Sequence, residues 1–403
     1  MKSDPPNIPP TGRGRSLFAY CAFHFIDDGF TDSFYILIPF LAAEFQLSYG
    51  QVGLLKGVYS GTTSLLQFPM SLLGEKVGEV AVIGGGIIGL AGGFALLSSV
   101  TGYVALILTF ILAKGMGAGQ HGLSSSVLSR VFEHSGRRAA MGTYNFAGDL
   151  GKVSLPFILA LLINLWGWRK AIFFVAFAGM AVGGFLWGIS RKLHAFSPMP
   201  QLPKKENGDK GLWGIRHQRR FGFLLAIGVL DISVRNALLT FLPFLLLAKE
   251  IPLSQVGFAL TLLFAGGAAG KFACGILAEW FGVIPMVVTT EALTAAGIFS
   301  LLWFPGESLW VLLPFVGIVL NGTSSVLYAT VAEIIPPASR SRGYGLYYAI
   351  TLGSGAVAPM IFGLITDFRG LFTTILSAGF LALLTVPLAR YLTVKEDPPA
   401  NSA

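Results

Sequence analysis

The sequence predicts an all-α membrane protein with twelve transmembrane helices, arranged as two pseudo-symmetric six-helix halves. Three observations support this fold class. Hydrophobic residues make up 54% of the 403 residues and charged residues only 12%, about half of the roughly 25% that soluble domains carry. Apolar runs of about 20 residues, long enough to cross a bilayer, recur along the whole chain. The second half of the sequence also repeats features of the first.

The apolar runs are continuous rather than alternating, which favours helices over the roughly ten-residue strands of a β-barrel. We expect helices at residues 17–42, 50–74, 80–99, 103–130, 139–163, 168–190, 220–247, 254–278, 284–303, 308–333, 341–364 and 370–392. The expected domains are a disordered tail (1–16), a first bundle (17–190), a basic linker (191–219), a second bundle (220–392) and a C-terminal tail (393–403).

The basic residues are distributed unevenly between the two ends of these helices. With an even number of spans, 19 Lys and Arg residues fall on the side of the termini and 4 on the other side. The positive-inside rule then places both termini in the cytoplasm, in a protein integral to the inner (plasma) membrane. The net charge of +8 is therefore interpreted as a topology signal, and no nucleic-acid partner is expected.

An internal repeat relates the two halves. Residues 38–55 align without a gap to residues 242–259, so that Pro39 meets Pro243 at an offset of 204. At the same offset Asp27 meets Asp231. Polar, Gly and Pro matches kept in order over about 100 residues argue against chance. Two similar halves joined by a basic linker indicate a transporter whose halves rock around a central site.

A loop motif carries a family resemblance. The stretch "SLLGEKVGEVAV" resembles the G-x-x-x-D-R-x-G-R-R loop of the major facilitator superfamily, with Ser71 and Glu79 departing from it. The second copy, "GILAEWFGVIP", keeps the acid and the second glycine. The resemblance implies the twelve-helix fold of that family and a role in conformational gating for this loop and the basic loops. The gating candidates are Glu75, Lys76, Gly78, Glu279, Arg138 and Arg340.

Residues 115–156 are similar to the fosmidomycin-resistance group of that superfamily. The similarity lies in a Gly-rich segment with a His and following Ser residues, a basic loop, and a G-x-x-G helix that ends in Pro. The matching residues are His121, Ser125, Arg138, Gly148, Gly151 and Pro156. The resemblance implies a proton-driven exporter of small organic molecules.

Ionisable residues inside the apolar runs are the main functional candidates, because charges at membrane depth are costly and face a cavity or a partner. The near balance of six acids and five bases indicates that many are paired. The acids are Asp27, Asp28, Asp32, Asp149, Asp231 and Glu291, and the bases are Lys56, Lys114, Lys152, Arg235 and Lys271.

The first helix holds the densest group. His24, Asp28 and Asp32 are spaced i, i+4, i+8 and share one face, whereas Asp27 points about 100° away. Two close carboxylates in a low dielectric do not readily ionise together, so one of them can carry a proton. The alternatives are neutralisation by Lys56 or another base, or hydration of Asp32 near the helix end. We expect proton coupling at Asp28, Asp27 and Asp231.

The other buried charges suit a substrate cavity. Asp231 and Arg235 are spaced i, i+4 and either pair locally or let the arginine reach the first helix. His121 has small neighbours, so a packed structural histidine is the alternative to a binding one. The expected substrate-binding residues are His24, Asp32, Lys56, His121, Asn145, Asp149, Lys152, Arg235, Lys271, Asn321 and Tyr347. The bases favour an anionic or zwitterionic substrate.

We therefore predict a monomeric secondary transporter that exports a small organic compound by proton-coupled antiport. No enzyme motif or cofactor is expected; "GGGIIGLAGG" lies within an apolar run and is interpreted as helix packing. The alternative is a carrier of a divalent metal or metal chelate, with His24, Asp28 and Asp32 as ligands. A membrane scaffold or receptor without transport is disfavoured by the density of buried charge.

Overall fold

A computed structural model describes residues 10–132, 136–193, 218–334 and 340–392. Within these ranges the chain is almost entirely helical and contains no strand, which confirms the predicted all-α class. The first half comprises α1 (Pro10–Phe45), α2 (Tyr49–Val77), α3 (Glu79–Leu97), α4 (Tyr103–Gly117), α5 (Gln120–Val131) and α6 (Arg137–Leu193). The second comprises α7 (Gln218–Ala248), α8 (Leu253–Phe281), α9 (Val283–Trp303), η2 (Gly306–Ser308), α10 (Leu309–Ile334), α11 (Arg340–Leu383), α12 (Thr385–Ala389) and η4 (Arg390–Leu392).

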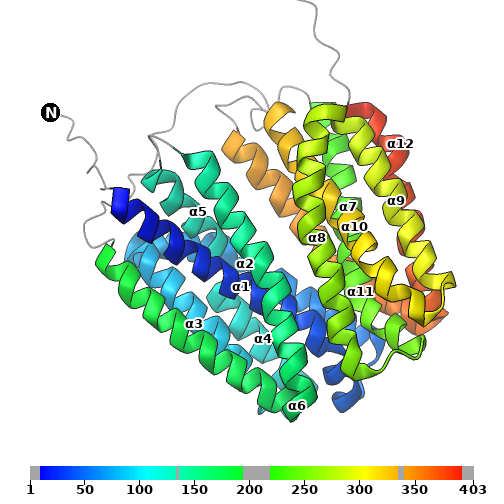
Figure 1. Ribbon diagram of the computed structural model, residues 1–403, viewed down its shortest axis with the longest axis horizontal. Helices are drawn as coiled ribbons and strands as arrows, with labels where there is room; N and C mark the ends of the chain where they lie inside the picture. The colour runs from blue at the N-terminus through cyan, green and yellow to red at the C-terminus, as the bar shows by residue number, and fades with distance from the viewer. Residues whose placement is uncertain (1–9, 133–135, 194–217, 335–339, 393–403) are drawn as a thin grey trace, which may run out of the picture.

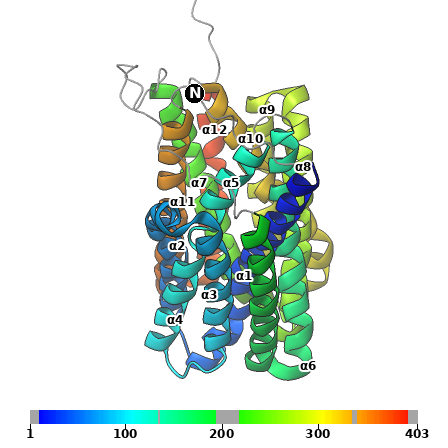
Figure 2. The same ribbon diagram turned by 90° about the vertical axis from the view of Figure 1, so that its left-hand side faces the viewer.

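The two halves lie side by side as separate bundles (Figures 1 and 2). In the described ranges, eight helical segments are long and apolar enough to cross a membrane. Two of these, α6 and α11, reverse direction at Gly167 and Gly370, so each supplies two crossings. The more polar α1 and α2, of 36 and 29 residues, pack among them. Together these segments give the twelve predicted spans.

The backbone of the turns follows the sequence repeat. Several residues with positive φ occur in pairs that are 204 or 203 positions apart, the same offsets as in the sequence. The pairs are Gln46 (φ 52°) with Glu250 (φ 63°), Gly78 (99°) with Gly282 (87°), and Gly167 (74°) with Gly370 (84°). The left-handed region is uncommon for residues other than glycine. Equivalent turns in the two halves thus share an unusual conformation, which confirms the repeat.

Backbone carbonyls at positions that correspond between the two halves also accept hydrogen bonds, but from different side chains. Arg169 donates to the carbonyls of Ser98 (2.6 Å) and Val100 (2.7 Å) in the first half. In the second half the carbonyls 204 residues later, those of Leu302 (2.9 Å) and Phe304 (2.6 Å), accept from Lys249. A helix end leaves such carbonyls without intrahelical partners, so both halves close the same turn with a base from elsewhere in the chain.

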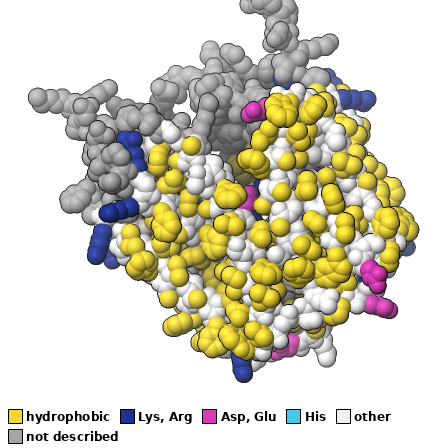
Figure 3. Space-filling model, viewed as in Figure 1, with side chains coloured by type: hydrophobic (Ala, Val, Ile, Leu, Met, Phe, Trp, Pro, Cys, Tyr) yellow, Lys and Arg dark blue, Asp and Glu magenta, His cyan; other side chains and the backbone are white. Residues whose placement is uncertain are grey.

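The halves meet mainly through α2 against α11 and α6 against α8. A Cβ on Gly53 would lie 2.1 Å from the carbonyl oxygen of Pro359, and one on Gly257 would lie 2.4 Å from the Cβ of Ala160. These contacts lie near the α1–α2 and α7–α8 turns. Toward the end that carries the N-terminus the two bundles diverge (Figure 1), and the surface between them is hollowed (Figure 3).

The outer wall is suited to lipid. Large hydrophobic side chains cover the visible face and charged ones gather toward its two ends (Figure 3). Leu65 and Phe68 on α2 and Phe368 on α11 have exposed fractions of 78%, 70% and 82%. Such exposure is costly in water and neutral in a hydrocarbon layer, so this surface fits an integral membrane protein.

One predicted boundary is wrong, at the start of the first helix. The first helix begins at Pro10, not residue 17, so residues 10–16 of the predicted tail are helical. Proline is favoured in the first helical turn, where its missing N–H is not needed. The span predicted at 103–130 is confirmed as one segment, 103–131, long and apolar enough to cross a membrane; within it, α4 and α5 are separated only by Ala118 and Gly119, in the glycine-rich stretch "GMGAG".

The predicted linker 191–219 is helical at both edges, because α6 runs to Leu193 and α7 starts at Gln218. The remainder of the linker, residues 1–9 of the N-terminal tail and the C-terminal tail 393–403 lie outside the described residues.

The contact between α2 and α11 predicts a difference between two glycines of α2. Gly53→Ala places a methyl group against the Pro359 carbonyl, whereas Gly61→Ala meets its nearest atom at 3.8 Å. Overpacking of this kind costs about 1–3 kcal/mol. We therefore expect Gly53→Ala to lower the thermal unfolding midpoint of the purified protein, and Gly61→Ala to leave it near wild type. Equal midpoints for the two variants would contradict the close approach of the halves.

Candidate functional site

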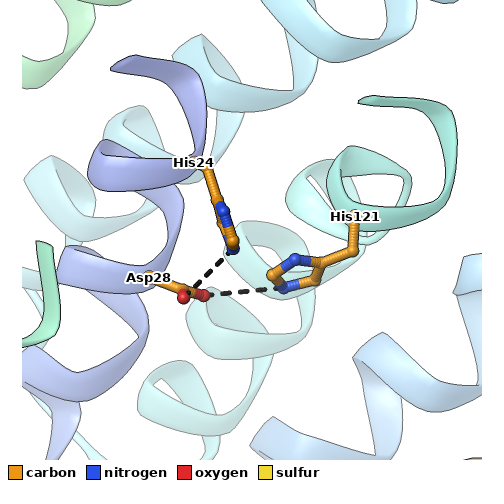
Figure 4. Close-up of side chains that lie close together, drawn as sticks. All are labelled: His24, Asp28 and His121. Atoms are coloured by element: carbon orange, nitrogen blue, oxygen red, sulfur yellow. Dashed lines mark ion pairs between the residues drawn. The ribbon is translucent and has the colours of Figure 1, made fainter. Parts of the chain in front are cut away.

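The site begins with a histidine–carboxylate pair on α1. His24 and Asp28 are both buried, and His24 Nε2 lies 3.1 Å from Asp28 Oδ2 (Figure 4). The other ring nitrogen, Nδ1, lies 2.8 Å from the carbonyl oxygen of Tyr144, and the two rings stack with centroids 4.0 Å apart. Since a carbonyl only accepts hydrogen bonds, Nδ1 carries a hydrogen.

The Nε2–Oδ2 contact then requires a second proton. A neutral imidazole with its hydrogen on Nδ1 has only a lone pair at Nε2, and a carboxylate oxygen is also an acceptor. A hydrogen bond between them exists only when the imidazole or the carboxyl group is protonated. The spacing i, i+4 on one helix holds the two groups together. At 3.1 Å the His24–Asp28 contact is thus a hydrogen bond only when one proton is shared between the two groups.

His121 joins the pair from α5. Its Nε2 lies 3.4 Å from Asp27 Oδ2 and 3.6 Å from Asp28 Oδ1, and its ring meets His24 edge-on at 5.0 Å. Its side chain is 44% exposed, so it is not the packed structural histidine considered as the alternative. His121 contacts both carboxylates, although they were predicted to point in different directions. The break between α4 and α5 sets its position, one residue into α5.

A chain of ion pairs connects Asp28 to the second half. Lys152 Nζ lies 2.9 Å from Asp28 Oδ2 and 3.3 Å from Asp149 Oδ1. The same Asp149 oxygen lies 2.6 Å from Nζ of Lys271, which belongs to α8. We call His24, Asp28, Lys152, Asp149 and Lys271 the ion-pair chain. It starts at the His24–Asp28 pair in the first half and ends on a base of the second half.

Two glycines of α6 make room for this arrangement. A Cβ on Gly148 would lie 2.5 Å from both Asp28 Oδ2 and His24 Cε1. A Cβ on Gly151 would lie 2.1 Å from the carbonyl oxygen of Phe25. The G-x-x-G pattern thus lets α6 approach α1 closely enough for Lys152 to reach Asp28.

Lys56 and Lys114 form a separate basic group. Both are buried, and Lys56 Nζ lies 4.4 Å from the ring centroid of Tyr35 and 5.1 Å from that of Tyr59. Lys114 Nζ donates to Thr31 Oγ1 at 2.8 Å. Within the described ranges neither ammonium group has a carboxylate within 4.0 Å. The base beside Asp28 is therefore Lys152, and Lys56 is held by the faces of aromatic rings.

The second half carries a carboxyl pair at the position that repeats Asp27. Asp231 and Glu291 are both buried and lie close enough to interact. Thr323 and Thr385 lie beside Glu291. Arg235 Nη2 lies 3.6 Å from Asp231 Oδ2, so the arginine pairs on its own helix, one of the two arrangements that the spacing allowed.

The remaining candidate binding residues are more scattered. Asp32 is half-buried, and Asn145 is exposed. Asn321 donates to the carbonyl of Gly317 on its own helix at 3.3 Å and packs against α8. Tyr347 is buried, with its hydroxyl against α7. Their roles as substrate ligands stay predictions.

The predicted gating residues form no described ion pair. Glu75, Lys76 and Glu279 are exposed, and Gly78 ends α2 with a φ of 99°. The charged contact near this loop is instead a hydrogen-bonded ion pair between Glu79 and Arg130, which joins α3 to α5. Sequence reasoning noted Glu79 only as a departure from the motif. The side chains of Arg138 and Arg340 lie outside the described residues.

The site also offers a set of metal-ligating atoms. One atom each from His24, Asp28 and His121 lies within 4.8 Å of the other two. Asp32, which the sequence placed in the alternative metal set, is not part of this group, whereas His121 is. The hydrogen bond from His24 Nδ1 to a carbonyl is the second-sphere arrangement typical of ligating histidines.

With this geometry in hand, comparisons with known proteins agree on the kind of molecule. A family model described as Major Facilitator Superfamily matches residues 18–245 and 223–403. The chain is 21% identical over 367 residues to the uncharacterized MFS-type transporter YfnC of Bacillus subtilis, covering 90% of this chain and 89% of that one. It is 23% identical over 371 residues to the fosmidomycin resistance protein of Escherichia coli, covering 90% and 88%.

A further relative is the gentisate transporter of Corynebacterium glutamicum, 25% identical over 374 residues with 86% of this chain and 80% of that one covered. Among solved structures, the fold is similar to that of a bacterial homologue of the human lysosomal transporter Spinster in an inward-facing and occupied conformation. The TM-score is 0.78 at 16% identity, with 94% and 96% of the two chains covered. At this identity the likeness shows the fold alone.

The contact between Asp149 and Lys271 predicts a coupled effect on stability. Asp149→Asn and Lys271→Gln each remove one charge of a partly buried pair that joins the halves. In a double-mutant cycle on the thermal stability of the purified protein, we expect a coupling free energy of about 1 kcal/mol. The control is a second double-mutant cycle that combines Lys271→Gln with Glu307→Gln. Glu307 is an exposed residue on η2, and we expect no coupling in that cycle. Additive effects in both cycles would mean that the pair contributes nothing.

Proposed function

Because this chain belongs to the Major Facilitator Superfamily of membrane transporters, we propose that it is a proton-coupled antiporter of a small organic anion or zwitterion. Transport proceeds by alternating access, with export as its direction. The proton gradient is the driving force, and no resident cofactor takes part. The protein acts as a monomer in the inner membrane with both termini in the cytoplasm, as the distribution of basic residues favours.

One observation supports this proposal: the ion-pair chain links the His24–Asp28 pair in one half to a base in the other. Protonation of Asp28 removes its negative charge and with it the attraction that holds Lys152 at 2.9 Å. Lys152 then turns to Asp149, which it already approaches at 3.3 Å, and competes there with Lys271. The proton at His24–Asp28 thereby changes the strength of the ion pair between the halves.

An anionic substrate affects the same ion pairs by competing for their ammonium groups. Lys152 and Lys271 have side chains that are 28% and 29% exposed although they lie within the bundle. A carboxylate entering between the halves can bind these ammonium groups in place of Asp28 or Asp149. Asp28, once released from Lys152, takes up a proton more readily because burial disfavours an unpaired charge. Substrate release and proton release are then linked, as antiport requires.

The aromatic side chains of the site favour a substrate with an apolar part. Tyr328, Tyr347 and Tyr348 form a cluster with ring centroids 5.2 to 6.2 Å apart. Arg235 lies close to this cluster on the side of the second half. A cation next to aromatic faces binds an organic acid through both its charge and its hydrocarbon. The gentisate transporter among the relatives has, by its name, an anionic cargo.

The proposal predicts proton movement that depends on Asp28. Purified protein is placed in liposomes with a pH-sensitive dye inside, and small carboxylates, phosphonates and zwitterions are supplied in turn. We expect at least one of them to drive proton flux in the wild type. Asp28→Asn cannot exchange the proton, so its flux falls to the level of protein-free liposomes. The matched control, Glu307→Gln, keeps wild-type flux.

Uptake of a labelled compound from the same panel is measured in parallel. If Asp28→Asn retains full gradient-dependent uptake with proton flux, Asp28 is not the coupling residue. If the wild type transports a compound with no proton flux at any pH, the protein is not a proton antiporter.

A second candidate function, transport of a divalent metal ion or its chelate, is favoured by the ligand group of His24, Asp28 and His121. Imidazole and carboxylate suit ions such as Mn²⁺, Co²⁺ and Zn²⁺. The proximity of Lys152 to Asp28 opposes a bare cation, because the ammonium group must leave before an ion binds.

The metal hypothesis predicts a rise in thermal stability when Mn²⁺, Co²⁺ or Zn²⁺ is added to the purified wild type. Binding at 100 times Kd stabilises a folded protein by about 2.7 kcal/mol. His121→Gln should abolish this rise, since it removes one of three ligands, while Glu307→Gln, which removes an exposed carboxylate on η2, serves as the control outside the site. If the metal-dependent rise in thermal stability persists in His121→Gln, or is absent from the wild type, His24, Asp28 and His121 do not form a metal-binding site.

A further inference from the structure

The end of the molecule opposite the N-terminus contains a pair of contacts between the halves that the transport site does not include. Asp367, on α11, reaches the start of α2 in the other half. Its Oδ1 accepts from the backbone N–H of Tyr49 at 2.9 Å, and its Oδ2 accepts from that of Gly50 at 2.8 Å. Oδ2 also accepts from the hydroxyl of Ser48 at 3.0 Å. One carboxylate thus makes three hydrogen bonds across the interface.

These bonds complete the cap of α2. The first N–H groups of a helix have no intrahelical acceptors. In α2 the N–H of Gln51 is accepted by Ser48 Oγ at 3.2 Å, in a capping box within the same helix. The two preceding N–H groups, those of Tyr49 and Gly50, are accepted only from outside, by Asp367. The negative charge also lies at the positive end of the helix dipole.

The repeat places a second contact at the equivalent position. Asn164 is 203 residues before Asp367, and its Nδ2 donates to the carbonyl oxygen of Ser254 at 3.0 Å. Ser254 lies in the first turn of α8 and is 204 residues after Gly50. Each half therefore sends a side chain from near its glycine turn to the start of a helix in the other half. The two contacts differ in that only Asp367 is charged.

We propose that the hydrogen bonds of Asp367 are the main contacts that hold the two halves together at this end of the transporter, and we call them the latch. The Asn164 contact is its weaker counterpart. Alternating access requires the halves to separate here when they close at the other end. That separation breaks three charge-assisted hydrogen bonds to the Asp367 carboxylate, two from backbone N–H groups and one from a hydroxyl. It also breaks one hydrogen bond between neutral groups at Asn164. Charge-assisted bonds are about twice as strong as neutral ones. The latch therefore favours the state that is open toward the N-terminal end.

Close packing beside Asp367 ensures that its hydrogen bonds form only in the state in which the halves touch at this end. The backbone of Gly363 lies against the start of α2, where an added Cβ would be 2.4 Å from the carbonyl oxygen of Tyr49. Tyr49 also packs its ring against Phe244 of α7, with centroids 5.2 Å apart. The carboxylate bonds form only when these surfaces are in contact, because the backbone N–H groups of α2 cannot reach across a gap. Opening this end removes all of them together.

The test measures distances between spin labels in the full-length protein, with Cys21 and Cys274 replaced by alanine. One label pair, at Thr101 and Phe304, reports on the latched end. The other pair, at Val77 and Phe281, reports on the opposite end. We expect Asp367→Ala to raise the population with a long 101–304 distance and a short 77–281 distance by roughly fivefold, and Asn164→Ala by no more than about twofold. Asp367→Asn should lie between wild type and Asp367→Ala.

Glu307→Ala, which removes an exposed carboxylate from η2 at the same end, is the matched control and should leave both distances unchanged. Thermal unfolding midpoints confirm that each variant is folded. Unchanged distance populations in folded Asp367→Ala, or a larger shift in Asn164→Ala than in Asp367→Ala, would overturn the proposal. No substrate or proton gradient is needed, so this result is independent of the proton-antiport hypothesis.

Discussion

Neutralising Asp28 is the constraint on which the rest of the site depends. A carboxylate buried at the depth of a membrane needs a positive partner or a proton, and Asp28 has access to both. Lys152 Nζ lies 2.9 Å from Asp28 Oδ2, and His24 Nε2 lies 3.1 Å from the same oxygen. Because both partners meet the same oxygen, the state of one affects the other. Lys152 is shared in turn with Asp149, and Asp149 with Lys271, so the constraint extends across the interface between the halves.

The helix geometry around Asp28 follows from this requirement. Lys152 reaches the carboxylate because Gly148 and Gly151 leave space between α6 and α1. His121 reaches it from the second position of α5, directly after the local interruption of the helix at Ala118 and Gly119. Each departure from a regular, tightly filled bundle therefore brings a functional group toward one carboxylate. At the end where the halves meet, glycines on α2 and α11 serve the opposite purpose and close the interface.

Much of this could be predicted from the sequence, for physical reasons. Long apolar runs and the offset of 204 gave the spans and the two halves, because membrane crossing and repeated turns leave periodic marks. The shared face of His24 and Asp28 followed from helical spacing alone. The identity of the base beside Asp28 did not: the sequence left open Lys56 or another base, and because α1 packs against α6 the base is Lys152. Contacts between helices, such as Glu79 with Arg130 or Asp367 with the start of α2, depend on packing that one sequence does not encode locally.

The central claim is that a proton at His24–Asp28 changes the contact between the halves. The most direct measurement is the spin-label distance between the ends of α2 and α8 nearest the N-terminus, followed as a function of pH in wild type and Asp28→Asn. We expect the distance population of the wild type to change with pH. In Asp28→Asn, which cannot exchange that proton, the population should stay fixed over the same range. A pH-dependent change of equal size in both proteins would mean that a proton at Asp28 does not control the contact between the halves.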